Sequence, residues 1–197
     1  MFVQVVKGKS TNPDAMVKLG EKWQQELRPG AKGFLGSTVG AAPDGTFVAV
    51  IQFTDDVAAK ANSDRPEQDA FFKEMSQYID GEPNFRESSD TSLLFDGPSE
   101  KATFVQVMES TCKDRAKAES MESGEMLDAL RTARPDLLGG LRAWIGDQVI
   151  EVAYFTSEAD ARAAEKSDAF DAPQQDFAAL YDNMTYTDLP NPQINLA

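Results

Sequence analysis

Two glutamines occupy corresponding places in segments that should form buried strands. Gln4 lies within Phe2–Val5 and Gln106 lies within Phe104–Val107, each between valines. A buried side-chain amide must find hydrogen-bond partners. Each glutamine could therefore bind the carbonyl or hydroxyl group of a ligand, or it could hold neighbouring backbone and helix groups. The residues alone leave both interpretations open.

A second polar group stands where a helix is expected to break. Asn62 and Arg65 flank Ser63–Asp64, and Arg65 could bind an anionic or enolate-like ligand oxygen through charge-assisted hydrogen bonds. The alternative is local capping by the Ser-Asp pair, with Arg65 solvated or paired to Glu67. We favour this alternative. Since Ala169 stands in the corresponding region of the second half, two such sites would be unequal.

Aromatic residues could form a flat apolar pocket. Trp23 and Phe72 lie on expected helix faces, whereas Trp144 and Tyr154 lie on expected strands. Aromatic residues at such spacing usually belong to the core, but they also suit a pocket in which a few polar groups orient an aromatic ligand. The candidate ligand-binding residues are Gln4, Trp23, Asn62, Arg65, Phe72, Gln106, Trp144 and Tyr154.

The composition narrows the chemistry further. The chain has no histidine, which excludes histidine-based triads, histidine metal sites and the usual general base near neutral pH. Cys112 is the single cysteine, so no internal disulfide can form; it has no counterpart in the first half and is interpreted as incidental. We find no glycine-rich phosphate loop and no acid/base pair, and we expect neither a metal nor a cofactor.

The net charge of −14 bears on partners. Lysines and arginines are scattered among acids, without the basic stripe that nucleic acids or anionic membranes require. No run approaches the ~20 apolar residues of a membrane helix, and no export signal opens the chain. We therefore expect a cytoplasmic protein whose partner is a small organic ligand, present as a monomer or a homodimer of the full chain.

The two halves of the chain resemble each other. Phe2–Val5 recurs at 104–107 and Phe53–Thr54 at 155–156, both at an offset of 102. Arg28–Pro29, Gly33 and Leu35 recur at an offset of 106, which suggests four residues gained before Arg134 and four lost in the following hairpin. The predicted domains are residues 1–97 and 102–190, with a linker at 98–101 and a C-terminal tail, expected to be coil, at 191–197.

Hydrophobic periodicity and turn residues predict the same order of elements in both halves. In the first half these are a strand at 2–6, a helix at 13–27, a strand hairpin at 33–39 and 46–53, helices at 55–61 and from Pro66, and a strand at 86–95. In the second half they are a strand at 104–108, a helix at 113–132, a hairpin at 138–145 and 148–155, helices at 158–166 and from Pro173, and a strand at 184–187.

The order β-α-β-β-α-β, twice, is the ferredoxin-like motif. Each repeat should form an antiparallel four-stranded sheet with helices on one face, and the other face needs a cover. We predict an α+β protein in which two tandem repeats pack their sheets together as an intramolecular pseudo-dimeric barrel.

These residues resemble the dimeric α+β barrel superfamily, within it the antibiotic-biosynthesis-monooxygenase-like group. The resemblance rests on Phe2–Val5 and Phe104–Val107 in the first strands, together with Asn62–Gln68 and Ser167–Phe170. The resemblance implies kinship with cofactor-free oxygenases and haem-degrading oxygenases, among others. The haem-degrading branch has an axial histidine, which this chain lacks, and a tryptophan where Lys60 and Ala164 stand, so haem degradation is not expected.

Three functions follow as hypotheses. The first is binding of a small apolar or aromatic molecule in a cavity between helices and sheet, without turnover. The second is a cofactor-independent monooxygenase acting on a phenolic or polyketide-like substrate, with Gln4, Trp23, Asn62 and Arg65 forming its pocket. The third is a non-catalytic protein-interaction module.

Overall fold

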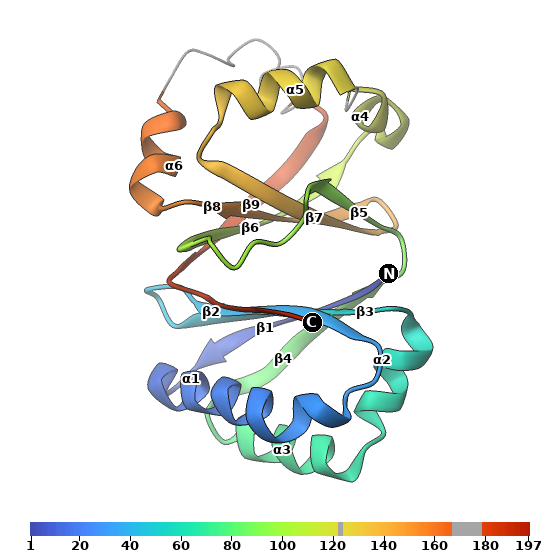
Figure 1. Ribbon diagram of the computed structural model, residues 1–197, viewed down its shortest axis with the longest axis vertical. Coiled ribbons are helices and arrows are strands. Elements are labelled where there is room, and N and C mark those ends of the chain that lie inside the picture. Colours follow the sequence, from blue (N-terminus) through green and yellow to red (C-terminus); the bar gives the residue numbers. More distant parts are fainter. Residues whose placement is uncertain (122–123, 167–178) are drawn as a thin grey trace. The chain divides into compact units, whose positions relative to one another are not determined.

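The computed structural model describes residues 1–121, 124–166 and 179–197, which form two compact units (Figure 1). The first unit comprises Met1–Thr91 and Leu189–Ala197, and the second comprises Ser92–Asp188. Within the described ranges, no helix is both long enough and apolar enough to cross a membrane.

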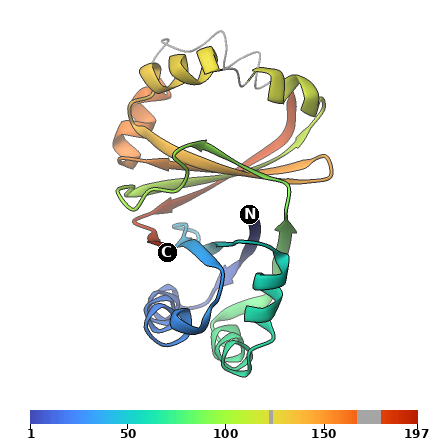
Figure 2. The same ribbon diagram turned by 45° about the vertical axis from the view of Figure 1, so that its right-hand side comes forward.

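The first unit is built on a five-stranded antiparallel sheet in the order β10-β2-β3-β1-β4. Its strands are β1 (Phe2–Ser10), β2 (Phe34–Ala41), β3 (Thr46–Phe53), β4 (Ile79–Ser88) and β10 (Gln193–Leu196). The helices α1 (Pro13–Lys22), α2 (Asp56–Ser63) and α3 (Pro66–Ser76) lie on one face, with α1 and α3 side by side in both views (Figures 1 and 2). This helix layer and this face of the sheet enclose the candidate site.

The second unit repeats the plan with the order β5-β7-β8-β6-β9. Its strands are β5 (Thr91–Phe95), β6 (Phe104–Cys112), β7 (Leu137–Ile145), β8 (Gln148–Phe155) and β9 (Tyr181–Pro190). Its described helices are α4 (Arg115–Met121), α5 (Gly124–Ala133) and α6 (Glu158–Ala164). The predicted pair of tandem ferredoxin-like repeats is therefore confirmed.

Each sheet has five strands rather than four, because β5, which follows β4, joins the second sheet, and β10, which follows β9, joins the first. The predicted single strand at 86–95 is wrong: β4 ends at Ser88, and β5 begins at Thr91 and joins the second sheet. The predicted coil at 191–197 is also wrong, since β10 pairs with β2 in the first sheet. The compact units therefore cut across the two sequence repeats.

Glycines on equivalent strands make room for the exchanged segments. A side chain at Gly36 on β2 would meet Leu196 at 3.0 Å and the backbone oxygen of Asn195 at 3.1 Å. A side chain at Gly139 on β7 would come within 2.1 Å of the backbone oxygen of Gly97, just after β5. Backbone approaches this close need a residue without a Cβ atom.

Strand pairing corrects the predicted offset of 106. Phe34 lies opposite Phe53 in the first unit, and Leu137 lies opposite Phe155 in the second. Phe34 therefore corresponds to Leu137, and Gly36, not Gly33, corresponds to Gly139. The backbone hydrogen bonds along both pairs of strands determine which residues of the two repeats are equivalent, whereas the match in sequence involves only a glycine and a leucine.

One helix prediction in the second half is confirmed in its described part and another changes. The helix expected at 113–132 is helical at Arg115–Met121 (α4) and Gly124–Ala133 (α5), and residues 122–123 fall outside the described residues. Tyr181 and Met184, expected on a helix that starts at Pro173, lie in strand β9, while residues 167–170 and the start of that helix fall outside the described residues. Tyr181 and Met184 nevertheless pack in the core with Trp144, as their apolar character requires.

Candidate functional site

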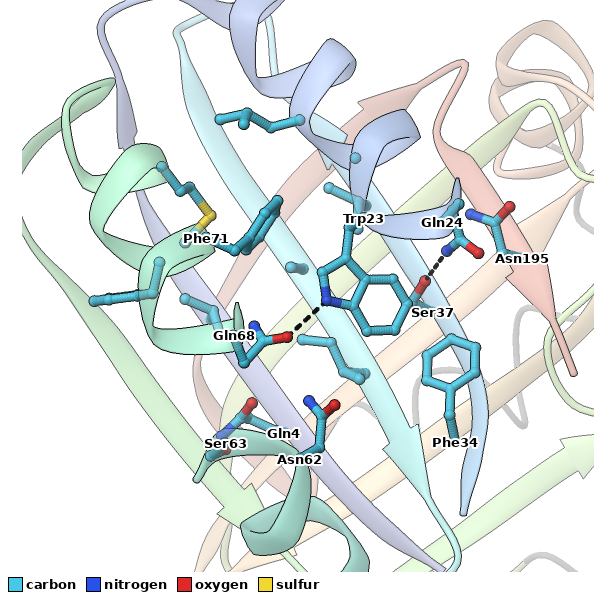
Figure 3. A pocket seen from close by; sticks show the side chains of 18 of the residues that line it. Gln4, Trp23, Gln24, Phe34, Ser37, Asn62, Ser63, Gln68, Phe71 and Asn195 are labelled. Atoms are coloured by element: carbon cyan, nitrogen blue, oxygen red, sulfur yellow. Dashed lines mark hydrogen bonds between the residues drawn. The ribbon is translucent and has the colours of Figure 1, made fainter. Parts of the chain in front are cut away.

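A cavity of about 380 Å³ lies between the helices and the sheet of the first unit (Figure 3). Strands β1, β2, β3, β4 and β10 form its floor, and α1, α2 and α3 form its roof. Its volume lies within the range of small-molecule sites in proteins, about 300–1,000 Å³. Every lining residue belongs to this unit, so the site is complete within it.

The wall of the cavity is mainly apolar and aromatic. The lining residues without polar side-chain groups, apart from the tryptophan nitrogen, are Val6, Met16, Leu19, Gly20, Trp23, Phe34, Val39, Phe47, Ala49, Ile51, Phe53, Phe71, Phe72, Met75 and Phe85. The Trp23 and Phe34 rings lie 5.1 Å apart, and the Phe72 and Phe85 rings 5.7 Å apart. Such a surface favours burial of a flat apolar molecule.

Trp23 is placed by an irregular turn of helix. The helix α1 begins at Pro13 after Asn12, whose side chain accepts a hydrogen bond from Ala15 N. It continues as a π-helix over Trp23–Leu27, in which Arg28 N donates to Trp23 O. Because a π-turn inserts one residue, it displaces the following side chains around the helix, and such turns are frequent at functional sites. Both Trp23 and Gln24 line the cavity as a result.

The indole is fixed across the roof of the cavity. Trp23 Nε1 donates to Gln68 Oε1 on α3 at 2.8 Å (Figure 3). The preceding residue, Lys22, forms an ion pair with α3, in which its Nζ lies 2.5 Å from Glu74 Oε2, and this contact with the carboxylate raises the pKa of Lys22. These two contacts join α1 to α3 above the sheet.

Asn62 forms one polar end of the cavity. It is buried, and its Oδ1 accepts a hydrogen bond from Arg65 Nη1 at 2.9 Å. Among the described residues, Asn62 Nδ2 makes no hydrogen bond, and Figure 3 shows this side chain directed into the cavity below Trp23. The amide can therefore donate a hydrogen bond to a ligand.

Arg65 stands behind Asn62 and does not line the cavity. Its guanidinium donates to Leu27 O at 3.0 Å, to Asn62 Oδ1, and through Nε to Glu67 Oε1 at 2.9 Å. Arg65 therefore ties the end of the π-turn to α2 and orients Asn62. The pairing of Arg65 with Glu67 agrees with the alternative that the sequence favoured. The capping expected of the Ser-Asp pair is wrong, because Ser63 Oγ donates back to Ala59 O, Asp64 pairs with Lys60, and no side chain caps the start of α3.

Gln4 and Phe72, two further predicted residues, do line the cavity. Gln4 Nε2 donates to Glu87 Oε1 on β4 at 2.7 Å, so part of its amide is engaged by the neighbouring strand. The second unit repeats this arrangement, since Gln106 Nε2 donates to Asp188 Oδ1 on β9 at 2.9 Å. A glutamine bonded to a carboxylate on the edge strand is thus a structural feature of both repeats.

Another polar end lies at the edge formed by β10. Gln24 Nε2 donates to Ser37 Oγ at 3.4 Å, and Gln24 Oε1 accepts from Arg28 Nη1 at 3.3 Å. Asn195, on β10, lies beside Gln24 in Figure 3. The polar lining residues that were not predicted from the sequence include Gln24, Ser37, Gln68 and Asn195. The alternation of polar and apolar residues in β2 was a usable signal for Ser37; the other three depend on tertiary contacts.

The electrostatics of the cavity are close to neutral. The described residues that line it include no lysine or arginine, and the one carboxylate among them, Asp69, is paired with Lys73 at 2.7 Å. The remaining polar lining groups are amides and hydroxyls, from Gln4, Gln24, Ser37, Asn62, Ser63, Gln68, Gln193 and Asn195. Burial of an ionised ligand here would lack a counter-charge and would be unfavourable.

The corresponding face of the second unit is filled differently. By strand pairing, Arg142 and Glu151 occupy the places of Val39 and Ala49. Arg142 Nη2 and Glu151 Oε1 lie 2.5 Å apart, with both side chains largely buried. Charged groups therefore stand in the second repeat where the first repeat has small apolar walls, which makes the two repeats chemically unequal.

The second-unit candidates do not form a common site. Trp144 is buried on the helix-covered face, with the Arg115 guanidinium 4.5 Å from its ring centre. Tyr154 pairs with Val105 and Gly139, which places it on the opposite face of the sheet from Trp144. Gln106 is held with Arg162 on the carboxylate of Asp188. Of the eight predicted residues, Gln4, Trp23, Asn62 and Phe72 share one cavity.

No group of three side chains among residues 1–121, 124–166 and 179–197 has the composition and spacing of a metal site. Cys112 is buried in the core of the second unit, in the cluster that contains Trp144.

Comparisons with known proteins bear on the fold. No protein-family model and no curated protein sequence matches the chain. Among solved structures, a proposed monooxygenase from Fusobacterium nucleatum is 10% identical, with a TM-score of 0.76 over 99% of this chain and 94% of that one. An anthrone oxidase-like protein is 11% identical, with a TM-score of 0.63 over 100% of this chain and 93% of that one.

The same fold also occurs in a protein of another kind. A major regulator of staphylococcal pathogenesis is 11% identical, with a TM-score of 0.53 over 97% of this chain and 99% of that one. Identities this low establish the architecture and leave the chemistry to the site itself. The chain thus has the tandem ferredoxin-like α+β fold of monooxygenase-like structures, which confirms the predicted resemblance at the level of the fold.

Proposed function

We propose that the cavity of the first unit binds a neutral, largely aromatic small molecule that carries a carbonyl or hydroxyl group. The observation that carries this proposal is the combination of aromatic walls, amide and hydroxyl groups, and no lysine or arginine in the lining. Affinity would come from burial of apolar ligand surface, at about 25 cal/mol per Å². Orientation would come from Asn62 Nδ2, which has no acceptor among the described residues.

A second candidate function is oxygenation of such a ligand without a cofactor. Two structural neighbours are described as a proposed monooxygenase and an anthrone oxidase-like protein, which favours this candidate. Within the site, Asn62 Nδ2 is a positioned donor in a largely apolar cavity, where it could stabilise negative charge that develops on a substrate oxygen. Oxidation of a tricyclic anthrone by O₂ to its quinone, with release of water, is a balanced test reaction of this class.

The binding test uses the two tryptophans of the chain. In the Trp144→Phe variant, Trp23 is the single tryptophan and lies in the cavity wall. Titration with anthrone, a neutral tricyclic ketone, under argon should quench its fluorescence in a saturable manner. The matched Trp23→Phe variant, which retains Trp144 in the other unit, should show no saturable change.

Native mass spectrometry of freshly purified protein is an independent readout, because a co-purified neutral molecule would identify a natural ligand directly. Oxygen consumption with anthrone then separates binding from turnover, and Asn62→Leu should slow any such turnover at least about tenfold. The binding proposal would be refuted if neither anthrone nor anthracene quenched the fluorescence of Trp23 at concentrations up to their solubility limits.

A further inference from the structure

The C-terminal strand β10 forms one wall of the cavity in the first unit. Its residue Asn195 pairs with Ser37 on β2, which in turn lies opposite Ile51 on β3. Paired residues of an antiparallel ladder direct their side chains to the same face. Asn195 therefore points to the same face as the other cavity residues, and it is among the lining residues.

Several contacts fix β10 in this position. Arg28 Nη2 donates to Leu196 O at 2.6 Å, and Gln193 Nε2 donates to Val17 O at 3.3 Å. Gly20 on α1 leaves room for Gln193, whose Oε1 would lie 2.3 Å from a Cβ at that position. A short edge strand held by both backbone pairing and side chains can place an amide accurately.

The amide of Asn195 is available to a ligand. Among the described residues it makes no hydrogen bond with the protein, although it is half-buried beside Gln24. Gln24, by contrast, is engaged at both ends, by Ser37 and Arg28. A half-buried amide with donor and acceptor both unused is suited to recognise a polar ligand atom.

Asn62 and Asn195 lie on different sides of Trp23 (Figure 3). One comes from α2 and the other from β10, with the apolar wall between them. We propose that Asn195 is a specificity-determining residue, and that the ligand carries two hydrogen-bonding groups on opposite edges of an apolar ring system, one for Asn62 and one for Asn195. This inference rests on the proposed function of the cavity.

The test compares three flat neutral probes of nearly equal size under argon: anthracene without a carbonyl, anthrone with one, and anthraquinone with two on opposite edges. Each dissociation constant is measured by Trp23 quenching in the Trp144→Phe background. Asn62→Leu and Asn195→Leu are compared with the parent, and Ile194→Val, on the other face of β10, is the control.

Loss of one ligand hydrogen bond corresponds to about a fivefold rise in the dissociation constant. Both asparagine variants should raise the dissociation constant of anthraquinone by about this factor. Only one of the two variants should raise the dissociation constant of anthrone, and neither should raise that of anthracene. Ile194→Val should leave all three constants within about twofold of the parent.

Two further variants guard against misfolding. Asn195→Ala removes the amide without adding bulk, and Gly36→Ala displaces β10 while keeping Asn195, since its Cβ would meet Leu196 and the Asn195 backbone. Both variants should weaken the binding of anthraquinone more than the binding of anthracene.

If Asn195→Leu and Asn195→Ala leave the anthraquinone constant unchanged while Asn62→Leu raises it, the role of Asn195 is wrong and the proposed binding function stands. If none of the three probes binds the parent protein, both the role of Asn195 and the proposed binding function are wrong.

Discussion

Gly30 and Arg65 should be energetically coupled, and this coupling tests whether Arg65 is a structural tie. A Cβ at position 30 would lie 2.5 Å from Arg65 Nη2 and 2.9 Å from its Cζ. The guanidinium cannot move away freely, because it donates to Leu27 O and Asn62 Oδ1. Gly30→Ala should therefore break these hydrogen bonds even though Gly30 does not need a left-handed backbone.

The magnitude follows from those contacts. Hydrogen bonds from a charged donor contribute about 1.5–3 kcal/mol each, and the pair with the exposed Glu67 adds little. Arg65→Ala should then lower the free energy of unfolding by about 3 kcal/mol, and Gly30→Ala by about 2 kcal/mol. Once Arg65 is absent, Gly30→Ala should become stabilising by about 0.5 kcal/mol, because alanine restricts the unfolded chain.

The assay is urea unfolding of the four members of this double-mutant cycle, followed by Trp23 fluorescence in the Trp144→Phe background so that the signal reports the first unit. Gly124→Ala is the control, since a Cβ there has no contact within 4 Å in the part of the chain that the structure describes; its effect on the free energy of unfolding should be the same with and without Arg65. Equal effects of Gly30→Ala with and without Arg65 would refute the structural role that we assign to the guanidinium.

Two further predictions concern the cavity and the hairpin of the first unit. The double variant Val39→Arg and Ala49→Glu copies the buried ion pair of the second repeat into the cavity. The variant should fold, and its affinity for anthrone should fall at least about tenfold. An unchanged affinity would show that the ligand binds elsewhere. The Lys9 ammonium and then the Thr46 amide hold the pKa of Asp44 far below its ordinary range. Because a lowered native pKa stabilises the fold above the unfolded-state value of about 4, Asp44→Asn should destabilise the protein near neutral pH and have a smaller effect near pH ~2 in urea titrations.

The local sequence determined the order of the elements and much of the site. The repeated strand motifs, the proline at the start of α3 and the apolar spacing in α1 are short-range signals, and they correctly predicted two ferredoxin-like repeats. The residues also predicted Gln4 within a strand and Trp23 on a helix face, and both line the cavity. These inferences succeeded because each depends only on the period of a strand or a helix.

Tertiary structure alone decided the exchange of strands and the second polar end of the cavity. Residues 193–196 read as coil because a four-residue edge strand is stabilised by its partner β2 and not by its own propensity. The π-turn at Trp23, which brings Gln24 into the lining, and the engagement of Arg65 by Leu27 O likewise depend on contacts distant in sequence. The sequence therefore determined which faces are apolar, whereas long-range backbone pairing decided which polar groups reach the cavity.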